Sequence, residues 1–191
     1  MHTLFLERAF RAIERVRQRL LRSTAALDRH GVPYAVIGGH AVAGWAARVD
    51  EDAVRNTAGV DLLLNRADLP RAVTALAEAG FVPTEVHGVT LFLERESPNP
   101  RRGIHVVLAG ERVRPHEPHP APSLARIKRS EEGFAVLDLP PLLTMKLTAN
   151  RDKDRVHIRD MLELGMITPD LEAQLPSDLR ARLDTIRANP E

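Results

Sequence analysis

The most informative part of the chain, Val36–Leu64, reads VIGGHAVAGWAARVDEDAVRNTAGVDLLL. An apolar strand is expected over residues 34–37; it runs into the double glycine Gly38-Gly39 and then into a short helix over residues 41–47. Glycine lets a ligand approach the backbone closely, and the free N–H groups at the start of a helix attract an anion. The stretch therefore predicts a strand, a turn suited to an anion, and a helix.

The end of the same stretch predicts a second buried strand over Val60–Leu64, with Asp61 among apolar neighbours. A carboxylate in such surroundings is costly unless it has a partner, which favours a role in a ligand site over that of a structural acid at a strand end. We expect Asp61 and the double glycine to face one cleft, which Lys146 closes from a later helix. The alternative for Lys146 is a packed stem with an amine that stays in water.

Helix and strand patterns continue along the rest of the chain. The other expected elements are a helix over 4–29, a helix over 67–79, hairpin strands over 81–87 and 90–94, a strand over 104–108, a proline-rich extended arm over 109–123, a strand over 134–137, helices over 140–149 and 154–164, and two short helices that start at Thr168 and Ser177. This order predicts an α/β (α+β) fold, in which a small mixed β-sheet has flanking helices and a C-terminal helical tail. We divide the chain into an N-terminal amphipathic helix packed on the core (1–31), an α/β core (32–138) and a C-terminal helical segment (139–191).

The N-terminal helix is expected to have an apolar face and a basic face. The apolar face consists of Leu6, Phe10, Ile13, Val16, Leu20 and Leu27. The basic face consists of Arg8, Arg11, Arg15, Arg19 and Arg22. A solvated surface is the usual explanation for such a row of arginines, and contact with RNA is the alternative. Because no aromatic residues alternate with these arginines, base stacking is not expected.

The composition excludes several classes of protein. Of 191 residues, 43% are hydrophobic and 28% are charged, which is typical of a folded globular chain. The absence of cysteine excludes disulfides, cysteine-bound zinc and thiol catalysis. No apolar run approaches the roughly 20 residues that a membrane helix needs, and the charged N-terminus does not suit a signal peptide, so we expect a cytoplasmic protein without a membrane partner. A formal charge of +1 argues against general coating of nucleic acid.

The turn, the acid and a later segment together resemble a known family. That segment, residues 145–161, reads MKLTANRDKDRVHIRDM. The combination resembles the nucleotidyltransferase superfamily that includes DNA polymerase beta, and most of all the bacterial AbiEii toxin group. The resemblance implies a nucleotidyltransferase-like core with a bound nucleoside triphosphate. The residues that it implies are Gly38, Gly39 and His40 for the phosphates, Asp61 for catalysis and metal binding, Lys146 and Arg151 for phosphate charge, and Asp152 as the acid after Arg151.

The acidic residues depart from the pattern of this superfamily. Its members carry two acids two positions apart on one strand, so that both side chains share a face and can hold two Mg²⁺ ions, and a third acid on a neighbouring strand. Here Asp61 matches the second acid, Gly59 stands in place of the first, and His105 stands near the third. The metal ligands are then Asp61 and His105, with Mg²⁺ or Mn²⁺ weakly held, and an aspartate with a histidine suits Mn²⁺ or Zn²⁺ better than Mg²⁺.

Other side chains remain open as metal ligands. The acids that could replace the missing ones from nearby loops are Asp50, Glu51, Asp52, Glu94 and Glu96. In the proline-rich arm, His116 and His119 are not expected to bind metal, because prolines keep that backbone extended.

From these residues we expect a nucleotidyltransferase-family protein that binds a nucleoside triphosphate and is weak or inactive as an enzyme, since Gly59 and His105 replace two acids. The first alternative is an active, metal-dependent and toxin-like enzyme that transfers a nucleoside monophosphate to RNA or protein, releases pyrophosphate, and has a cognate antitoxin. The second alternative is a module that binds RNA or protein without catalysis.

Overall fold

The computed structural model describes residues 2–53, 55, 57–86 and 88–189. Within these ranges, seven strands form one mixed sheet in the order β3-β4-β5-β2-β1-β7-β6. The strands are β1 (Tyr34–Ile37), β2 (Val60–Leu64), β3 (Phe81–Val86), β4 (Val89–Glu94), β5 (Ile104–Leu108), β6 (Ile127–Arg129) and β7 (Ala135–Leu137). The helices that accompany them make this the α/β fold with a mixed sheet that the sequence predicts.

The pairing at the centre of the sheet fixes the position of the acid. Strand β2 runs antiparallel to β1 and parallel to β5, and its Asp61 is in register with Ile37 on one side and His105 on the other. Because Ile37 is the last residue of β1, Asp61 lies beside the point where the chain leaves the sheet at Gly38. The buried residues Leu62, Leu63 and Leu64 complete β2 in the core.

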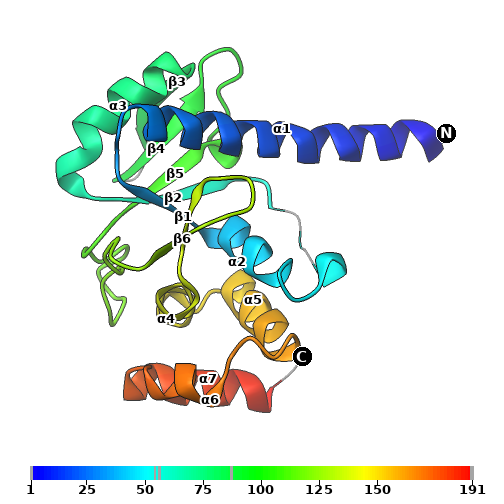
Figure 1. Cartoon of the computed structure of the whole chain (residues 1–191), viewed down its shortest axis with the longest axis vertical. Coiled ribbons are helices and arrows are strands. Elements are labelled where there is room, and N and C mark those ends of the chain that lie inside the picture. The colour runs from blue at the N-terminus through cyan, green and yellow to red at the C-terminus, as the bar shows by residue number, and fades with distance from the viewer. Residues whose placement is uncertain (1, 54, 56, 87, 190–191) are drawn as a thin grey trace.

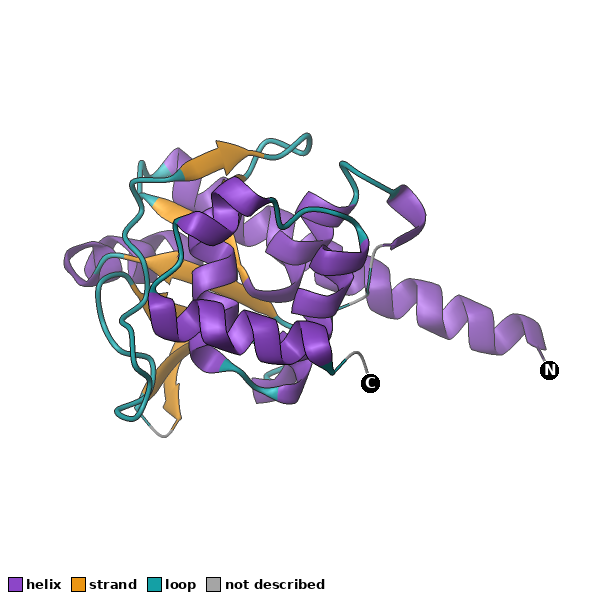
Figure 2. Cartoon of the chain, turned by 90° about the horizontal axis from the view of Figure 1, so that it is seen from below, coloured by secondary structure: helices purple, strands orange, loops and turns teal. Residues whose placement is uncertain are grey.

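Two groups of helices accompany the sheet. The helices are α1 (His2–Arg29), α2 (Gly38–Ala46), α3 (Leu69–Glu78), α4 (Leu139–Ala149), α5 (Asp152–Glu163), α6 (Pro169–Ala173) and α7 (Ser177–Ala188), with short 3₁₀ turns at Glu51–Ala53, Arg66–Asp68 and Pro100–Arg102. Helix α1 packs on α3, whereas α4, α5 and α7 contact one another and α2 packs on α4 and α5, so that the two groups lie at opposite ends of the view in Figure 1. Figure 2 shows helices in front of the strands, and α1 extends beyond the rest of the molecule in both views.

The N-terminal helix packs against the body only in its second half. Leu20 and Leu27 are buried in the hydrophobic core, but Leu6, Phe10 and Ile13 are exposed large apolar residues. The N-terminal part of α1 extends past the sheet in Figure 1, and Leu6 and Phe10 are about two-thirds exposed, whereas Ile13 lines a shallow pocket with Thr57 and Arg102. The expected apolar face is therefore continuous in sequence but covered only near its C-terminal end.

The basic face of α1 differs from the expected solvated row. Arg19 is 3% exposed, and its guanidinium donates a 2.8 Å hydrogen bond to Glu94. Arg22 donates a 2.5 Å bond to the same carboxylate and lies 4.6 Å from the centre of the Phe81 ring. Two of the five arginines thus anchor α1 to the β3–β4 hairpin, and they are not free for RNA. They also occupy Glu94, which is accordingly no metal ligand at the cleft.

Several element boundaries differ from the predicted ones. Helix α2 begins at Gly38, because the double glycine forms its first turn. Strand β6 was not predicted: its three residues are exposed at the sheet edge and show no alternation of apolar and polar side chains. The predicted end of the first hairpin strand, His87, lies outside the described residues. No helix in the described part of the chain is long and apolar enough to cross a membrane.

Candidate functional site

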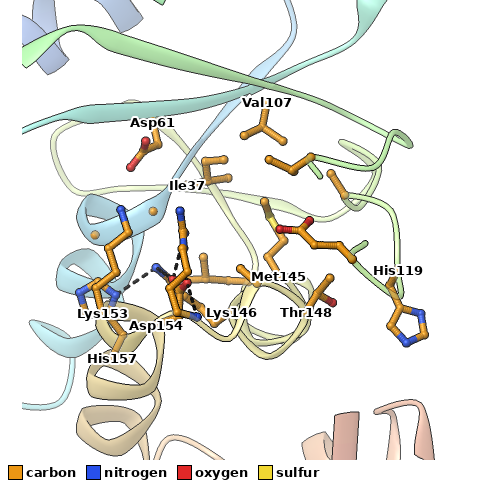
Figure 3. Close-up of a pocket in the computed structure, with 18 of the residues that line it drawn as sticks. Ile37, Asp61, Val107, His119, Met145, Lys146, Thr148, Lys153, Asp154 and His157 are labelled. Atoms are coloured by element: carbon orange, nitrogen blue, oxygen red, sulfur yellow. Dashed lines mark hydrogen bonds and ion pairs between the residues drawn. The ribbon is translucent and has the colours of Figure 1, made fainter. Parts of the chain in front are cut away.

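A pocket of about 140 Å³ opens where β1 turns into α2, and it is lined by residues from distant parts of the sequence. The turn contributes Gly38 and Gly39, β2 contributes Asp61, and helices α4 and α5 contribute Lys146 and the residues that follow it. The proline-rich arm between β5 and β6 supplies another wall. Figure 3 shows Asp61 on the sheet side, with Lys146, Asp154 and His157 across from it on the helices.

The two glycines are required by close approach at the turn. Gly38 has a φ of +69°, and a Cβ atom placed on it would lie 2.1 Å from Oδ2 of Asp61. A Cβ on Gly39 would lie 2.9 Å from the Thr57 side chain. The residue before the helix, Ile37, gives no side-chain cap, so the first N–H groups of α2 are available to an anion. The turn thus combines access to the backbone with a positive helix end.

Positions 59, 61 and 105, where the superfamily pattern has its acids, share one side of the sheet. His105 Nδ1 lies 3.6 Å from Oδ1 of Asp61, and this nitrogen is buried without a hydrogen-bond partner in the described chain. A Cβ on Gly59 would make ordinary contact with the His105 ring, at 3.4 Å. Positions 59, 61 and 105 therefore form one cluster, as the two-residue spacing predicts, but His105 does not line the pocket itself.

The residues present do not form a magnesium site by themselves. Across the described ranges, no group of three or more histidine and acidic side chains could hold a metal ion. Asp50 and Asp52 line a separate cavity with Arg55 and Asp160, away from Asp61. Since Mg²⁺ needs about six oxygen ligands in near-octahedral geometry, Asp61 alone is insufficient.

Helices α4 and α5 meet at a buried charge cluster. Asp154 is fully buried; it accepts a 3.0 Å hydrogen bond from Lys146 Nζ, and bonds of 2.6 and 3.2 Å from the Arg151 guanidinium. Asn150, between the helices, has a left-handed φ of 48° that turns the chain back and brings the three side chains together. Removing one partner from such a buried cluster leaves an unpaired charge, which costs several kcal/mol, about 3 to 5 in comparable cases.

The charge states of the cluster follow from burial and from its neighbours. Burial lowers the pKa of Lys146, and the nearby Asp154 carboxylate only partly offsets this effect. At Arg151, burial acts in the same direction, but the hydrogen bond to Asp154 outweighs it and raises the pKa. At Asp154, burial opposes ionisation, yet the bonds from Arg151 and Lys146 hold the pKa below its usual range. The carboxylate is thus ionised at neutral pH.

His157 completes the surroundings of Lys146. Its Nδ1 lies 3.0 Å from Lys146 Nζ, and because an ammonium has only donors, Nδ1 must accept. Burial and the charge of Lys146 lower the pKa of His157 to about 4, so the ring is neutral at physiological pH. A neutral histidine therefore orients the lysine without adding charge to the pocket.

Two of the residues that the resemblance implies lie outside the pocket. Asp152 is not the partner of the cationic pair: its side chain is 96% exposed and pairs with Arg155, whereas Asp154, two residues later, points inward. His40 does not line the pocket. Its Nε2 is buried without a partner in the described part of the molecule, and burial lowers its pKa, so a charge attraction to phosphate is not expected.

Searches by sequence and by structure give different results. No protein-family model matches the chain, and no curated protein matches it in sequence. An antigenic nucleotidyltransferase-like protein from Paracoccidioides brasiliensis, however, matches the structure with a TM-score of 0.54 and 17% identity, over 89% of this chain and 88% of that one. The chain has a nucleotidyltransferase-like fold.

Two other solved structures are less similar. The antibiotic-resistance factor ANT(2'')-Ia matches with a TM-score of 0.49 and 12% identity, over 94% of this chain and 86% of that one. JHP933 from Helicobacter pylori matches with a TM-score of 0.47 and 14% identity, over 93% of this chain and 74% of that one. Because both TM-scores are below 0.5, only the first match supports the nucleotidyltransferase-like fold.

The nucleotidyltransferase-like fold brings five predicted residues to one pocket: Gly38, Gly39, Asp61, Lys146 and Arg151. Sequence reasoning missed other polar side chains that line it, among them Lys153, Asp154, His157 and Glu117. The sequence offers no signal that separates Asp154 from Asp152, because the helix start that places Asp154 inward is visible only in the structure. No sequence signal marks Glu117, because it lies in an irregular arm.

The neutral His157 predicts a pH dependence of stability. Between about pH 6.5 and pH 4 the unfolded chain protonates this histidine and the folded chain does not, so the unfolded state binds more protons and stability falls as the pH falls. We expect His157→Asn to reduce this loss by about 1 to 3 kcal/mol relative to the native chain. Urea unfolding at pH 7, 6, 5 and 4.5 measures it. The control is His116→Asn, an exposed histidine; if both variants keep the native pH profile, His157 is not held neutral.

Proposed function

We propose that this protein binds the triphosphate of a nucleoside triphosphate in the pocket at the double-glycine turn. The observation that carries the proposal is that the free N–H end of α2 and three cationic side chains meet there: Lys146, Arg151 and Lys153 line the same pocket as Gly38 and Gly39. Because backbone N–H groups, the helix dipole and lysine or arginine charges all favour phosphate oxygens, the arrangement suits a polyphosphate better than a neutral ligand.

The three cations have different roles in this proposal. Lys146 and Arg151 are held in place by Asp154, so they present a fixed positive charge with little loss of side-chain entropy on binding. Lys153 is exposed and able to follow the ligand. The carboxylate of Asp61 beside Gly38 would meet the phosphates directly, and a divalent cation that arrives with the nucleotide would relieve this repulsion, with the phosphates supplying ligands that the protein lacks.

We further propose that nucleotide transfer is weak or absent. The first acid of the expected pair is replaced by Gly59, and the histidine in register with Asp61 offers no hard oxygen ligand. An active enzyme that transfers a nucleoside monophosphate to RNA or protein is the alternative. A toxin role and a cognate antitoxin remain predictions from the resemblance alone, and RNA binding through the α1 arginines is disfavoured because Arg19 and Arg22 already bind Glu94.

Nucleotide binding should depend on the turn and on pocket charge. We expect ATP or GTP with Mg²⁺ to bind the native chain, Gly38→Ala to abolish binding through strain and overlap with Asp61, and Lys153→Met to weaken it about three- to tenfold through loss of one charge. Isothermal titration calorimetry measures these affinities.

Two controls match these variants. Gly44→Ala lies in the same helix as Gly38, with open space around its Cβ, and Lys128→Met removes an exposed lysine from β6, outside the pocket. Both should bind like the native chain. Equal binding by Gly38→Ala and Gly44→Ala would place the nucleotide elsewhere.

The loss of an acid at position 59 has its own test. A side chain there fits without strain and faces the same cluster as Asp61, so Gly59→Asp should restore a second carboxylate. We expect this variant to gain Mn²⁺ affinity, by about tenfold, and to gain label transfer from a labelled nucleoside triphosphate to total RNA or protein. Gly59→Asn is the matched control. Full transfer by the native chain that Asp61→Asn abolishes would show instead that the enzyme is active.

A further inference from the structure

A second, shallow pocket lies between α1 and the segment of chain that leads into β2. It has a volume of about 280 Å³ and adjoins the pocket at the double-glycine turn, because Thr57 lines both. Three arginines line it: Arg15 and Arg19 from α1, and Arg102 from the 3₁₀ turn before β5. None of the described residues that line this pocket is acidic. The pocket is therefore strongly basic.

Arg19 is buried in the wall of this pocket with most of its hydrogen-bonding capacity unused. A guanidinium group carries five N–H donors, and the residue is only 3% exposed. Its Nη2 donates to Glu94, but Nε and Nη1 are buried without a hydrogen-bond partner in the described part of the chain. Because bulk water does not reach these two nitrogens, a ligand in the pocket that Arg19 lines is the partner available to them.

The positive charge around the pocket exceeds the negative charge of its nearest carboxylate. Glu94 accepts from Arg19 through Oε2 and from Arg22 through Oε1, so two cations share one negative charge. Arg15 and Arg102 are exposed, and neither forms an ion pair within the described ranges. A ligand that brings negative charge would thus meet three guanidinium groups, two of which have no carboxylate of their own.

The residues of this pocket indicate the class of ligand that it fits. Arginine N–H groups bind the oxygens of phosphate and carboxylate groups in pairs, whereas three arginines repel a metal ion or an ammonium group. A phosphate monoester carries about two negative charges at neutral pH and suits three cations better than a single carboxylate does. The rest of the wall is apolar and consists of Ala12, Ile13 and Val16. Since no aromatic side chain is among the described lining residues, a nucleobase would find no stacking partner there.

We propose that the pocket of Arg15, Arg19 and Arg102 is a second anion site, which binds the phosphate group of a small organic phosphate monoester with its apolar body along α1. The site goes beyond the proposed function and does not depend on it, because the triphosphate is assigned to the other pocket. The ligand uses only the unpaired donors of Arg19, so the bond to Glu94 that anchors α1 stays in place.

The test uses phenyl phosphate as the probe and phenol as its neutral counterpart. In ¹H–¹⁵N NMR titrations at pH 7.5, phenyl phosphate should shift the Nε–Hε signal of Arg19 and the amide signals of Thr57 and Ala58. Phenol should leave the arginine signal unchanged. The native chain should bind phenyl phosphate at least about tenfold more tightly than phenol, because only the phosphate pairs with the guanidinium groups.

Four exposed arginines provide matched variants. Arg15→Gln and Arg102→Gln remove lining side chains that have no ion-pair partner in the described chain, and each should weaken phenyl phosphate binding about three- to tenfold. Arg8→Gln on α1 and Arg101→Gln in the same 3₁₀ turn as Arg102 are the controls, since both arginines lie outside the pocket. Both controls should bind phenyl phosphate like the native chain.

Three results would overturn the proposal. The first is an equal affinity of the native chain, Arg15→Gln and Arg102→Gln for phenyl phosphate. The second is an equal loss of affinity in Arg101→Gln and Arg102→Gln, which would mean a general attraction to a basic surface. The third is an Nε–Hε signal of Arg19 that phenyl phosphate leaves unchanged.

ATP separates this site from the triphosphate pocket. Arg102→Gln should bind ATP like the native chain, and Lys153→Met, which weakens ATP binding, should bind phenyl phosphate like the native chain. Loss of both ligands in each variant would place them in one pocket and would overturn the second site. Phenyl phosphate binding that depends on Arg102, in a protein that binds no nucleoside triphosphate, would support the second site and overturn the proposed function alone.

Discussion

The arrangement of the pocket depends on one buried carboxylate, Asp154, which is shared by Lys146 and Arg151. Its oxygens accept bonds from both cations and from the Arg151 backbone, so that they are nearly saturated by neighbours in the sequence. Because the buried Lys146 would not be stable there without a counter-charge, the carboxylate fixes how α5 follows α4. The left-handed Asn150 makes that sharp return possible. The junction of α4 and α5 thereby forms one wall of the pocket.

The other side of the pocket depends on an equally strict constraint, which is the absence of side chains at the end of β1. The register of β1 and β2 places Asp61 against Gly38, where even one added carbon would overlap the carboxylate. A rigid acidic side and a rigid basic side thus face each other across a gap. The cationic side and the helix end favour phosphate, whereas Asp61 selects for a ligand that brings its own positive counterion.

The sequence predicts most of the fold and part of the site, for reasons that differ between residues. The double glycine and Asp61 are recognisable because sharp turns and acids are rare in apolar strands, and Lys146 because it interrupts an apolar helix. The sequence alone does not show whether Asp152 or Asp154 faces the buried cluster, since this depends on where α5 begins. Arg19 and Glu94 lie 75 positions apart, and no local pattern reveals their ion pair. Glu117 lies in an arm without periodicity, where only the folded chain shows which side chain faces inward.

An amide ¹H–¹⁵N NMR titration with the α,β-methylene analogues of ATP and GTP, in the presence of Mg²⁺, shows whether a triphosphate binds at the double-glycine turn. If the triphosphate lies on the free end of α2, the largest shifts will fall on the amides of Gly38 and Gly39, with smaller shifts at the start of α5. Shifts concentrated elsewhere, for example in the separate cavity beside Trp45 and Phe134, would contradict it, as would a spectrum that neither nucleotide changes.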